Sequence, residues 1–136
     1  MERGAEKIEE LNDLSGAILD SSIEVHRHLG GPGLLEVIYE EALARELTLR
    51  GFKVERQVHV PVYYKGESVR QPLILDLLVN NVIIEVKSVE KFNQVFLSQL
   101  LTYLRLSNRP LGIVVNFGER FVKDGFHRVV NQFPII

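Results

Sequence analysis

Two acidic side chains and a lysine lie within a stretch that is otherwise almost wholly apolar, LILDLLVNNVIIEVKS at residues 73–88. A two-residue turn at the Asn-Asn step, residues 80–81, folds such a stretch into a β-hairpin. Asp76 then faces Glu85 across the two strands, and Lys87 lies two residues further along the same face. Facing like charges destabilise a sheet, and burying them without a partner costs more. The pair therefore needs a compensating partner, and a divalent cation is the simplest one.

Asp76, Glu85 and Lys87 together suit the hydrolysis of a phosphodiester. Carboxylates on neighbouring strands bind Mg²⁺ or Mn²⁺, which prefer oxygen ligands and retain several waters. The metal lowers the pKa of a water and neutralises charge that builds on a phosphate, while a lysine on the same face orients or deprotonates that water. The structural alternative is an ordinary ion pair between Lys87 and one of the acids at a sheet end. The apolar flanks favour the functional interpretation.

A second group of polar side chains is predicted at the start of a helix, in the segment GLLEVIY at residues 33–39. Glu36 and Tyr39 are three residues apart and share a helix face. In the functional interpretation, Glu36 reaches the metal pocket or its water from a helix packed on the sheet. The helix dipole alone also favours an acid in the first turn. On spacing alone, this ordinary explanation is the stronger one.

Gln99 and Tyr103 are one turn apart on a later predicted helix and point the same way. A glutamine amide beside a phenol suits contacts with phosphates or base edges near an active site. Both groups are equally compatible with the partly exposed edge of a core. Spacing leaves the two interpretations open.

Other kinds of site find little support in the sequence. The chain has no cysteine, which excludes disulfides, thiolate zinc sites and cysteine-ligated iron–sulfur clusters. His26 and His28 point in different directions on a helix, and no cluster of histidines and acids of the kind that zinc hydrolases use is found. Neither a P-loop nor a dinucleotide-binding glycine pattern is present, because LGGPG at residues 29–33 does not follow a strand.

The periodicity of apolar residues predicts the elements that carry these side chains. Helical spacing predicts helices over residues 8–28, 34–50 and 93–107. Alternating or continuous apolar runs predict strands over residues 53–64, 73–79, 82–88 and 111–117, with a last short strand or turn near 127–133. We therefore expect an α/β fold in which helices cover a mixed sheet and in which the hairpin is covered on both faces.

Length and composition predict one globular domain over residues 1–136, with residues 1–30 as an additional N-terminal helix. The chain is 46% hydrophobic and 25% charged, which is ordinary for a soluble protein. It lacks an apolar run of about 18 residues, the length that a membrane helix needs. Its first residues, MERGAEKIEE, are charged where a signal peptide is apolar. We therefore expect a cytoplasmic protein with no membrane partner.

The charge is distributed unevenly along the chain, whose net charge is −2. Residues 1–50 contain 11 acidic and 5 basic side chains, and residues 51–136 contain 7 and 11. The basic C-terminal part could face a polyanion such as nucleic acid, although scattered surface charge explains the numbers equally well. The acidic first helix, peripheral to the core, is a candidate element for a homodimer.

Several motifs, in this order, resemble those of a known family. GPGLLEVIYEEAL at residues 31–43 resembles the signature of the GxxExxY proteins, a group within the PD-(D/E)XK nuclease superfamily. ILDLLVNNVIIEVK at 74–87 resembles the metal-binding and catalytic motif of that superfamily. QLLTY at 99–103 resembles the Q-x-x-x-Y motif of its RecB-like branch, and NFGERFVKDGFHRVV at 116–130 looks like the closing segment of the family. The resemblance covers about residues 8–131.

The resemblance implies a restriction-endonuclease-like αβββαβ core, a mixed central sheet flanked by helices. It implies that Asp76 and Glu85 are metal ligands and catalytic residues, that Lys87 is the catalytic lysine, and that Glu36 is a helix acid at the metal. The substrate contacts that it implies are Gln99, Tyr103 and Tyr39.

The sequence departs from the family pattern at two positions on the substrate side. Ile74 stands where a basic residue is frequent, and Phe96 stands where a histidine is frequent. The expected function is a Mg²⁺- or Mn²⁺-dependent nuclease that hydrolyses phosphodiester bonds in DNA rather than RNA. The alternative is a catalytically weak or inactive module that binds nucleic acid or a protein partner, because a fold alone does not decide function.

Overall fold

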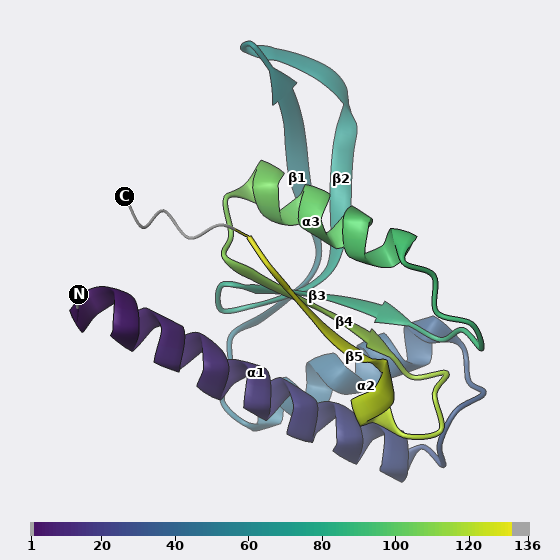
Figure 1. Ribbon diagram of the computed structural model, residues 1–136. Helices are drawn as coiled ribbons and strands as arrows, with labels where there is room; N and C mark the ends of the chain where they lie inside the picture. The colour runs from purple at the N-terminus through teal and green to yellow at the C-terminus, as the bar shows by residue number, and fades with distance from the viewer. Residues whose placement is uncertain (1, 132–136) are drawn as a thin grey trace.

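The computed structural model describes residues 2–131, with side chains from residue 7 onward, and this part of the chain forms a five-stranded sheet between helices (Figure 1). The helices are α1 (Glu2–His28), α2 (Glu36–Leu49), α3 (Val95–Ser107) and a short 3₁₀ helix, η1 (Val122–Gly125). The strands are β1 (Val54–Tyr64), β2 (Glu67–Val79), β3 (Val82–Lys87), β4 (Leu111–Asn116) and β5 (Phe126–Val130). The predicted order of helices and strands is confirmed.

The five strands lie across the sheet in their order along the chain. β1, β2 and β3 form an antiparallel meander, β4 runs parallel to β3, and β5 is antiparallel to β4. α3 supplies the crossover that a parallel pair needs. The sheet is therefore mixed, and the αβββαβ order predicted for the core runs from α2 to β4.

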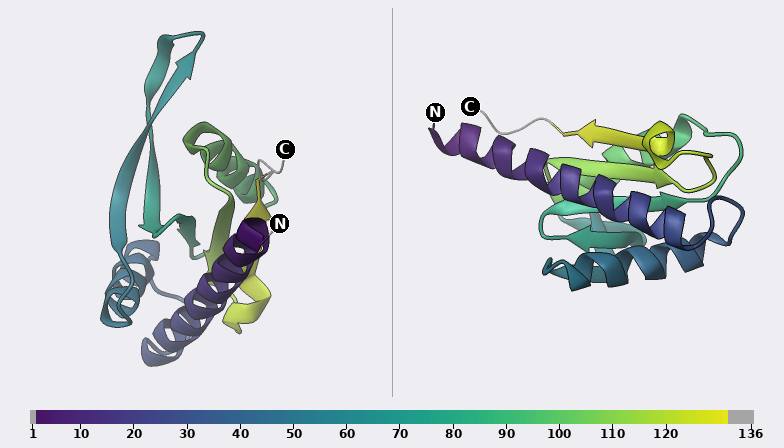
Figure 2. Two further views of the ribbon diagram at one scale, coloured as in Figure 1. Left: turned by 90° about the vertical axis from the view of Figure 1, so that its left-hand side faces the viewer. Right: turned by 90° about the horizontal axis from the view of Figure 1, so that it is seen from below.

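The sheet is covered on both faces: α1 and α2 lie on one side and α3 lies on the other (Figures 1 and 2). Side chains of the β2–β3 hairpin alternate between the two layers. Leu77 and Ile84 pack toward α1 and α2, whereas Leu78 and Ile83 pack toward α3. This double burial explains why the hairpin is apolar in nearly every position.

The turn between β2 and β3 has the predicted register. Leu77 pairs with Ile84 and Val79 pairs with Val82, which leaves a two-residue turn. Asn80 adopts a φ of 51°, a conformation that asparagine tolerates well, and its backbone N–H donates to the carbonyl of Lys53 at 3.0 Å. The turn is thus tied to the segment that leads into β1.

α1 is longer than the predicted helix and is integral to the core. It begins at Glu2, and its side chains Leu14, Ile18 and Val25 are buried in the layer shared with α2. The prediction that this helix is peripheral to the core is therefore wrong. That prediction was the basis for suggesting the helix as a dimer element. Within the described residues no helix has both the length and the apolar character to cross a membrane.

β2 begins at Glu67, six residues before the predicted start of the strand at residue 73. The segment ESVRQP is polar and contains Pro72, so its side chains carry no strand pattern. It is a strand because its backbone pairs with β1 in a long hairpin. At the other end of the chain, β5 matches part of the strand or turn predicted near 127–133, of which residues 132–133 lie outside the described residues.

Candidate metal and active site

The candidate site begins where the backbone ladder between β2 and β3 ends. The last backbone pair is Leu77 with Ile84, and beyond it side chains bridge the strands. The backbone N–H of Val86 donates to Asp76 Oδ2 at 2.9 Å, and the N–H of Asp76 donates to Glu85 Oε1 at 3.3 Å. The two carboxylates predicted to face each other therefore lie in the opening between the strands, and backbone donors orient both of them.

Next to this opening between the strands, the side chains of β2 stop alternating regularly between the two layers of the core. Leu77 packs against α1 and α2, yet Leu75, two residues earlier, packs on the α3 side. Opposite Asp76, between the Arg56–Leu77 and Val58–Leu75 pairs, Gln57 adopts a φ of 52°. A left-handed residue at this position bends β1, because it interrupts the regular pleat. Asp76 thus lies where the hairpin turns from one layer of the core to the other.

Glu85 is nearly inaccessible, and its surroundings disfavour its charged form. Burial, the charge of Asp76 and a hydrogen bond shared with Asp76 raise the pKa of Glu85 to about 9, whereas Lys87 acts in the opposite direction. Among residues 7–131, no basic side chain forms an ion pair with Asp76 or Glu85. The ordinary ion pair with Lys87, considered as the structural alternative, is therefore not what the structure contains.

The ammonium group of Lys87 is placed over an aromatic ring. Its Nζ lies 4.7 Å from the centre of the Phe96 ring on α3, within the range of a cation–π interaction. Phe92 packs edge-on against Phe96 with centroids 5.4 Å apart, and it stacks on His127 at 4.1 Å. Phe96, a departure from the family pattern, is thus a neighbour of the candidate catalytic lysine.

Glu36 approaches the same region from the start of α2. The hydroxyl of Ser88, directly after β3, donates to the carbonyl of Leu34 at 2.7 Å, which ties the end of β3 to the beginning of the helix. Partial burial raises the pKa of Glu36, Lys87 lowers it, and Asp76 raises it again. Glu36 is exposed to solvent and is not part of the Asp76–Glu85 pair.

The donor set fits a hard divalent cation with few protein ligands. Asp76 and Glu85 supply adjacent oxygen ligands with no competing cation, and Mg²⁺ is commonly held by one or two carboxylates together with water and substrate phosphate. Within the described part of the chain, no three acidic or histidine side chains come close enough to form a complete metal cluster. The structure therefore brings together the two predicted carboxylates and does not bring Glu36 into their group.

The predicted substrate contacts on α3 differ in their exposure. Gln99 is exposed, and Tyr103 is half-buried. Burial and the charges of Glu85 and Asp76 raise the pKa of the Tyr103 phenol, and the charge of Arg70 lowers it. Tyr103 packs against the layer of the core beneath α3, whereas the side chain of Gln99 is accessible to a ligand.

Tyr39 does not reach the surface of the site, as a substrate contact would require. It is fully buried, and its ring stacks on Phe117 with centroids 4.6 Å apart. Its hydroxyl donates to the carbonyl of Gly31 at 2.6 Å and accepts from the N–H of Leu34 at 3.2 Å. Tyr39 therefore holds the loop that leads to Glu36, and its role is one of support.

Asn116 is a buried polar residue at the site that the sequence analysis missed. Its Oδ1 accepts from the N–H groups of Val89 and Gly118, and its Nδ2 donates to the carbonyl of Val89, all at 3.0 Å. These bonds fix the chain just after Lys87. The sequence feature that could have indicated this residue is that Asn116 is the single amide near the end of the apolar run LGIVVNF.

Glu40 was also missed, although it is buried one turn after Glu36. Its Oε2 accepts from Arg56 at 2.9 Å and from Gln57 at 3.0 Å. This arrangement ties α2 to the bent part of β1. Arg56 neutralises the charge of Glu40, so Glu40, unlike Asp76 and Glu85, is stabilised without a metal.

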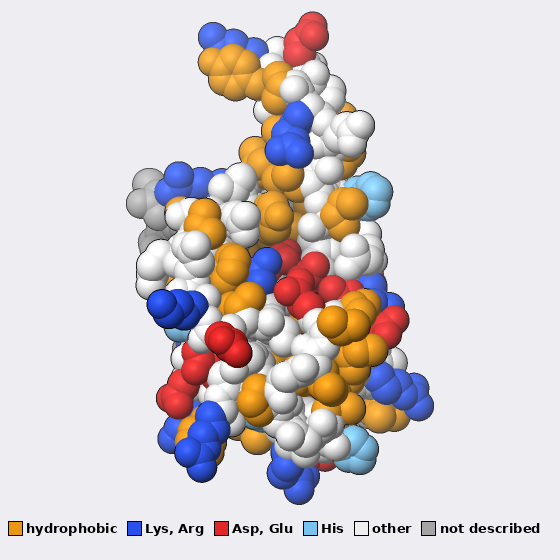
Figure 3. Space-filling view, turned by 90° about the vertical axis from the view of Figure 1, so that its right-hand side faces the viewer, with side chains coloured by type: hydrophobic (Ala, Val, Ile, Leu, Met, Phe, Trp, Pro, Cys, Tyr) orange, Lys and Arg blue, Asp and Glu red, His pale blue; other side chains and the backbone are white. Residues whose placement is uncertain are grey.

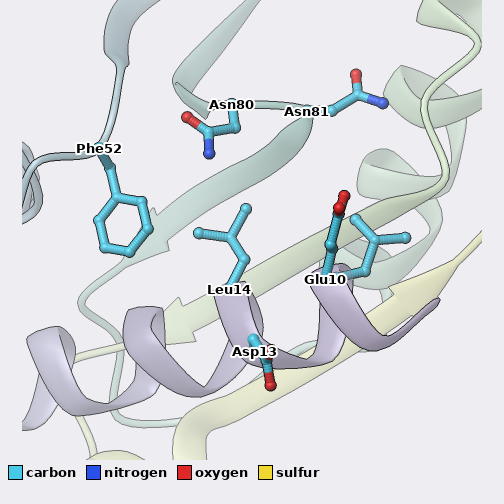
Figure 4. Close-up of a pocket in the computed structure, with 7 residues that line it drawn as sticks. Glu10, Asp13, Leu14, Phe52, Asn80 and Asn81 are labelled. Carbon is cyan, nitrogen blue, oxygen red and sulfur yellow. The ribbon is translucent and has the colours of Figure 1, made fainter. Parts of the chain in front are cut away.

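On one face of the molecule a group of acidic side chains lies beside a basic one, bordered by hydrophobic side chains (Figure 3). Two hollows among the described residues are lined by neither Asp76 nor Glu85 nor Lys87. One, of about 370 Å³, lies between α1 and the β2–β3 turn and includes Glu10 and Asn80 (Figure 4). The other, of about 520 Å³, lies near Gly31 and Phe121.

Comparison with known proteins agrees with the fold and with the superfamily that the motifs resemble. A family model described as the PD-(D/E)XK nuclease superfamily matches residues 12–129. The chain belongs to the PD-(D/E)XK nuclease superfamily, and its mixed sheet with flanking helices is the restriction-endonuclease-like α/β fold. Searches of curated proteins and of solved structures each found no match.

Proposed function

We propose that this protein is a Mg²⁺- or Mn²⁺-dependent nuclease that hydrolyses phosphodiester bonds in DNA. The observation that carries the proposal is the pair of adjacent, backbone-oriented carboxylates, Asp76 and Glu85, with which no basic side chain of residues 7–131 forms an ion pair. Without a cation the pair is destabilised by burial and mutual repulsion. Membership of a nuclease superfamily makes a catalytic metal the natural explanation. The same membership supports a nucleic acid as the substrate.

In this proposal each residue of the site has a distinct role. Asp76 and Glu85 would hold a divalent metal, which when bound would supply Lewis acidity and lower the pKa of a water. Lys87 orients the attacking water and stabilises the negative charge on the phosphate, for which an ammonium beside the pair is well placed. Glu36 accepts a hydrogen bond from a water at the edge of the site. The exposed amide of Gln99 contacts the substrate.

Metal binding and cleavage test the proposal separately. Calorimetric titration of Mn²⁺ into the metal-free protein should show one site that Asp76→Asn abolishes, because the variant loses a ligand charge. Cleavage of single-stranded, duplex and branched DNA, with RNA for comparison, should require the metal and fall strongly in Lys87→Ala. Glu55→Gln, an exposed acid on β1, is the matched control and should retain both properties. Absence of metal binding, or undiminished cleavage by Lys87→Ala, would refute the proposal.

A second candidate function is a module of the same fold that binds nucleic acid or a protein partner without cutting. Two observations favour it: Ile74 is 46% exposed beside the site, and the ring of Phe96 lies against Lys87. Both positions lack the polar group that relatives frequently have there. Binding of DNA with no cleavage at any concentration of Mg²⁺ or Mn²⁺ would support this function over the first.

A further inference from the structure

The outer part of the β1–β2 hairpin, residues 61–73, projects from the body of the molecule (Figures 1 and 2). We call this segment the arm. Nearly all of its side chains are exposed, including Tyr63 (62%), Tyr64 (65%) and Val69 (57%). A two-stranded hairpin without cover is only marginally stable in water, and exposed apolar and aromatic groups on such an element indicate contact with a partner.

One face of the arm continues the surface of the sheet that α3 covers. Val58 and Val60 pack in the layer beneath α3. The two register shifts next to Val62 each place an extra residue in β2 and none in β1. Side chains therefore keep alternating along β1, and Val62 and Tyr64 point to the same side as Val60. Arg70 pairs directly with Val62 and shares its face. The arm therefore presents Val62, Tyr64 and Arg70 on the side of the molecule where α3 and the candidate site lie.

The edges of the arm are poorly suited to pairing with another strand. Pro61 interrupts β1, the edge strand of the sheet, because proline lacks a backbone donor. The register shifts on both sides of Val62, and such irregularities twist an edge away from a partner strand. These features disfavour a dimer formed by strand addition and leave the face of the arm as the binding surface.

The basic groups of the arm are available for an anionic partner. Within residues 7–131, neither Lys65 nor Arg70 forms an ion pair with an acid. Lys65 Nζ lies 5.5 Å from the centre of the Tyr64 ring. Leu73 at the base of the arm packs in the same layer of the core as Tyr103 and Phe96, and the Phe96 ring lies under Lys87, so the arm extends from the layer that borders the candidate site. Figure 3 shows basic and hydrophobic side chains on the arm above the acidic group.

We propose that the arm binds a single strand of nucleic acid and leads it to the candidate site. Lys65 and Arg70 contact phosphates, and Tyr64 provides a ring surface on which a base stacks. Basic side chains beside an exposed aromatic ring are the combination that holds single strands without regard to sequence. A single strand suits this narrow face better than a duplex does, because its unstacked bases are free to meet the ring. The inference rests on the proposed function, which it deepens by naming the form of the substrate.

Binding is measured without turnover, by fluorescence anisotropy of a labelled oligonucleotide with the full chain in EDTA. Because stacking on an aromatic ring contributes ~1–3 kcal/mol per base, Tyr64→Ala should weaken single-strand binding by about five- to a hundredfold. Tyr64→Phe keeps the ring and should bind almost as well as the unchanged protein. Lys65→Ala with Arg70→Ala should reduce the slope of log K against log salt by about 1.4, since each phosphate contact on a single strand contributes about 0.7.

Matched controls separate this inference from the proposed function. Lys7→Ala removes an exposed basic residue of α1 and should leave affinity unchanged. The arm variants should retain the calorimetric Mn²⁺ site, so loss of strand binding with intact metal binding supports the arm alone. Equal affinity of the arm variants and the unchanged protein for single strands would overturn the inference, even if the enzyme cleaves DNA.

Three further outcomes would also overturn it. The first is failure of the unchanged protein to bind single strands at low salt. The second is tighter binding of a duplex of the same sequence, with the arm variants affecting only the duplex. The third is a change of oligomeric state in the arm variants, measured by sedimentation, with unchanged affinity for the oligonucleotide; this result would make the arm a surface between copies of the chain.

Discussion

Asp76 and Glu85 occupy the place in the β2–β3 ladder where two backbone hydrogen bonds would otherwise form. Their side chains accept from backbone N–H groups, so the sheet itself orients both carboxylates. The arrangement is costly for the metal-free protein, because the buried Glu85 lies against the half-buried Asp76 and no basic side chain of residues 7–131 forms an ion pair with either acid. At the scale of single residues, this pair is therefore a local loss of stability.

The raised pKa of Glu85 predicts how stability depends on pH in the metal-free protein. Between about 4.5, its ordinary value, and about 9, its value in the fold, the folded state retains a proton that the unfolded state releases. The contribution of Glu85 is therefore fully present below pH 4.5 and is lost as the pH rises, by at most ~1.4 kcal/mol per pH unit. Glu85→Gln, which stays neutral, should lose no stability from this source.

Urea unfolding in EDTA at several pH values measures this difference. The variant should exceed the unchanged protein in free energy of unfolding by about 1–3 kcal/mol near neutral pH, and the gap should widen toward pH 9. Asp124→Asn, which alters an acid of η1 outside the site, serves as the control. A gap that is constant with pH would show that Glu85 is ionised in the folded protein.

Phe96 is predicted to position the ammonium of Lys87. The cation–π interaction contributes about 0.5–2 kcal/mol, so Phe96→Leu, which keeps an apolar side chain but removes the ring, should lower the cleavage rate about 2- to 30-fold. KM should change little. A ring current also shifts the ε-methylene resonance of Lys87, measured by NMR of lysine-labelled protein, and this shift should vanish in the variant.

Phe121→Leu removes an exposed ring elsewhere and is the control for Phe96→Leu. The NMR measurement needs no turnover, so it remains informative if the protein only binds nucleic acid. An unchanged Lys87 resonance in Phe96→Leu would mean that the two side chains do not interact in solution.

Two connections at the scale of elements hold the end of β3 against the rest of the site. Ser88 ties it to the loop before α2, and Asn116 at the end of β4 ties the residues after it to the sheet. Both connections satisfy backbone polar groups just beyond the end of the strand. The end of β3 is therefore held by the loop before α2 and by β4, with which it pairs along its whole length.

Gly118→Ala tests this connection. A Cβ at Gly118 would lie 2.2 Å from the carbonyl oxygen of Val89, so the backbone must move away. The expected loss is about 1–3 kcal/mol, as for other crowded core positions, together with reduced cleavage. Gly16→Ala in α1, where nothing lies within 4 Å of the added atom, should instead stabilise by roughly 0.5–1 kcal/mol. Thermal unfolding compares the two, and equal stability of both variants would contradict the proposed contact.

The molecule as a whole combines a well-buried sheet with a projecting arm (Figure 1). Both layers of the core meet at the β2–β3 hairpin, so the carboxylates at its end are held by the most buried part of the fold. A ligand that relieves their repulsion should therefore stabilise the entire domain. The arm, which has little contact with the core, should be unaffected.

Divalent metal is accordingly predicted to raise the global stability of the protein. A ligand present at 100 times its Kd stabilises the folded state by ~2.7 kcal/mol, which gives a rise in Tm of several degrees for a domain of this size. Asp76→Asn should abolish most of the effect of Mn²⁺, measured by calorimetric unfolding with and without metal. An equal rise in Tm for the variant would indicate that the metal binds elsewhere.

Much of this architecture was determined by the sequence itself, since it depends on local signals. Apolar periodicity placed the three α-helices and the strands in the right order, although not the short η1, and the Asn80–Asn81 turn set the register that brings Asp76 opposite Glu85. Turn geometry and strand alternation act over a few residues, so one sequence is enough to infer them.

Only the tertiary structure decided how the site is built around that pair. Tyr39 proved to be a buried support, Phe96 a neighbour of Lys87, and Asn116 the link that holds the end of β3. The polar first half of β2 became a strand through its pairing with β1. These outcomes depend on contacts between residues far apart in the chain, where packing and backbone hydrogen bonding override local preference.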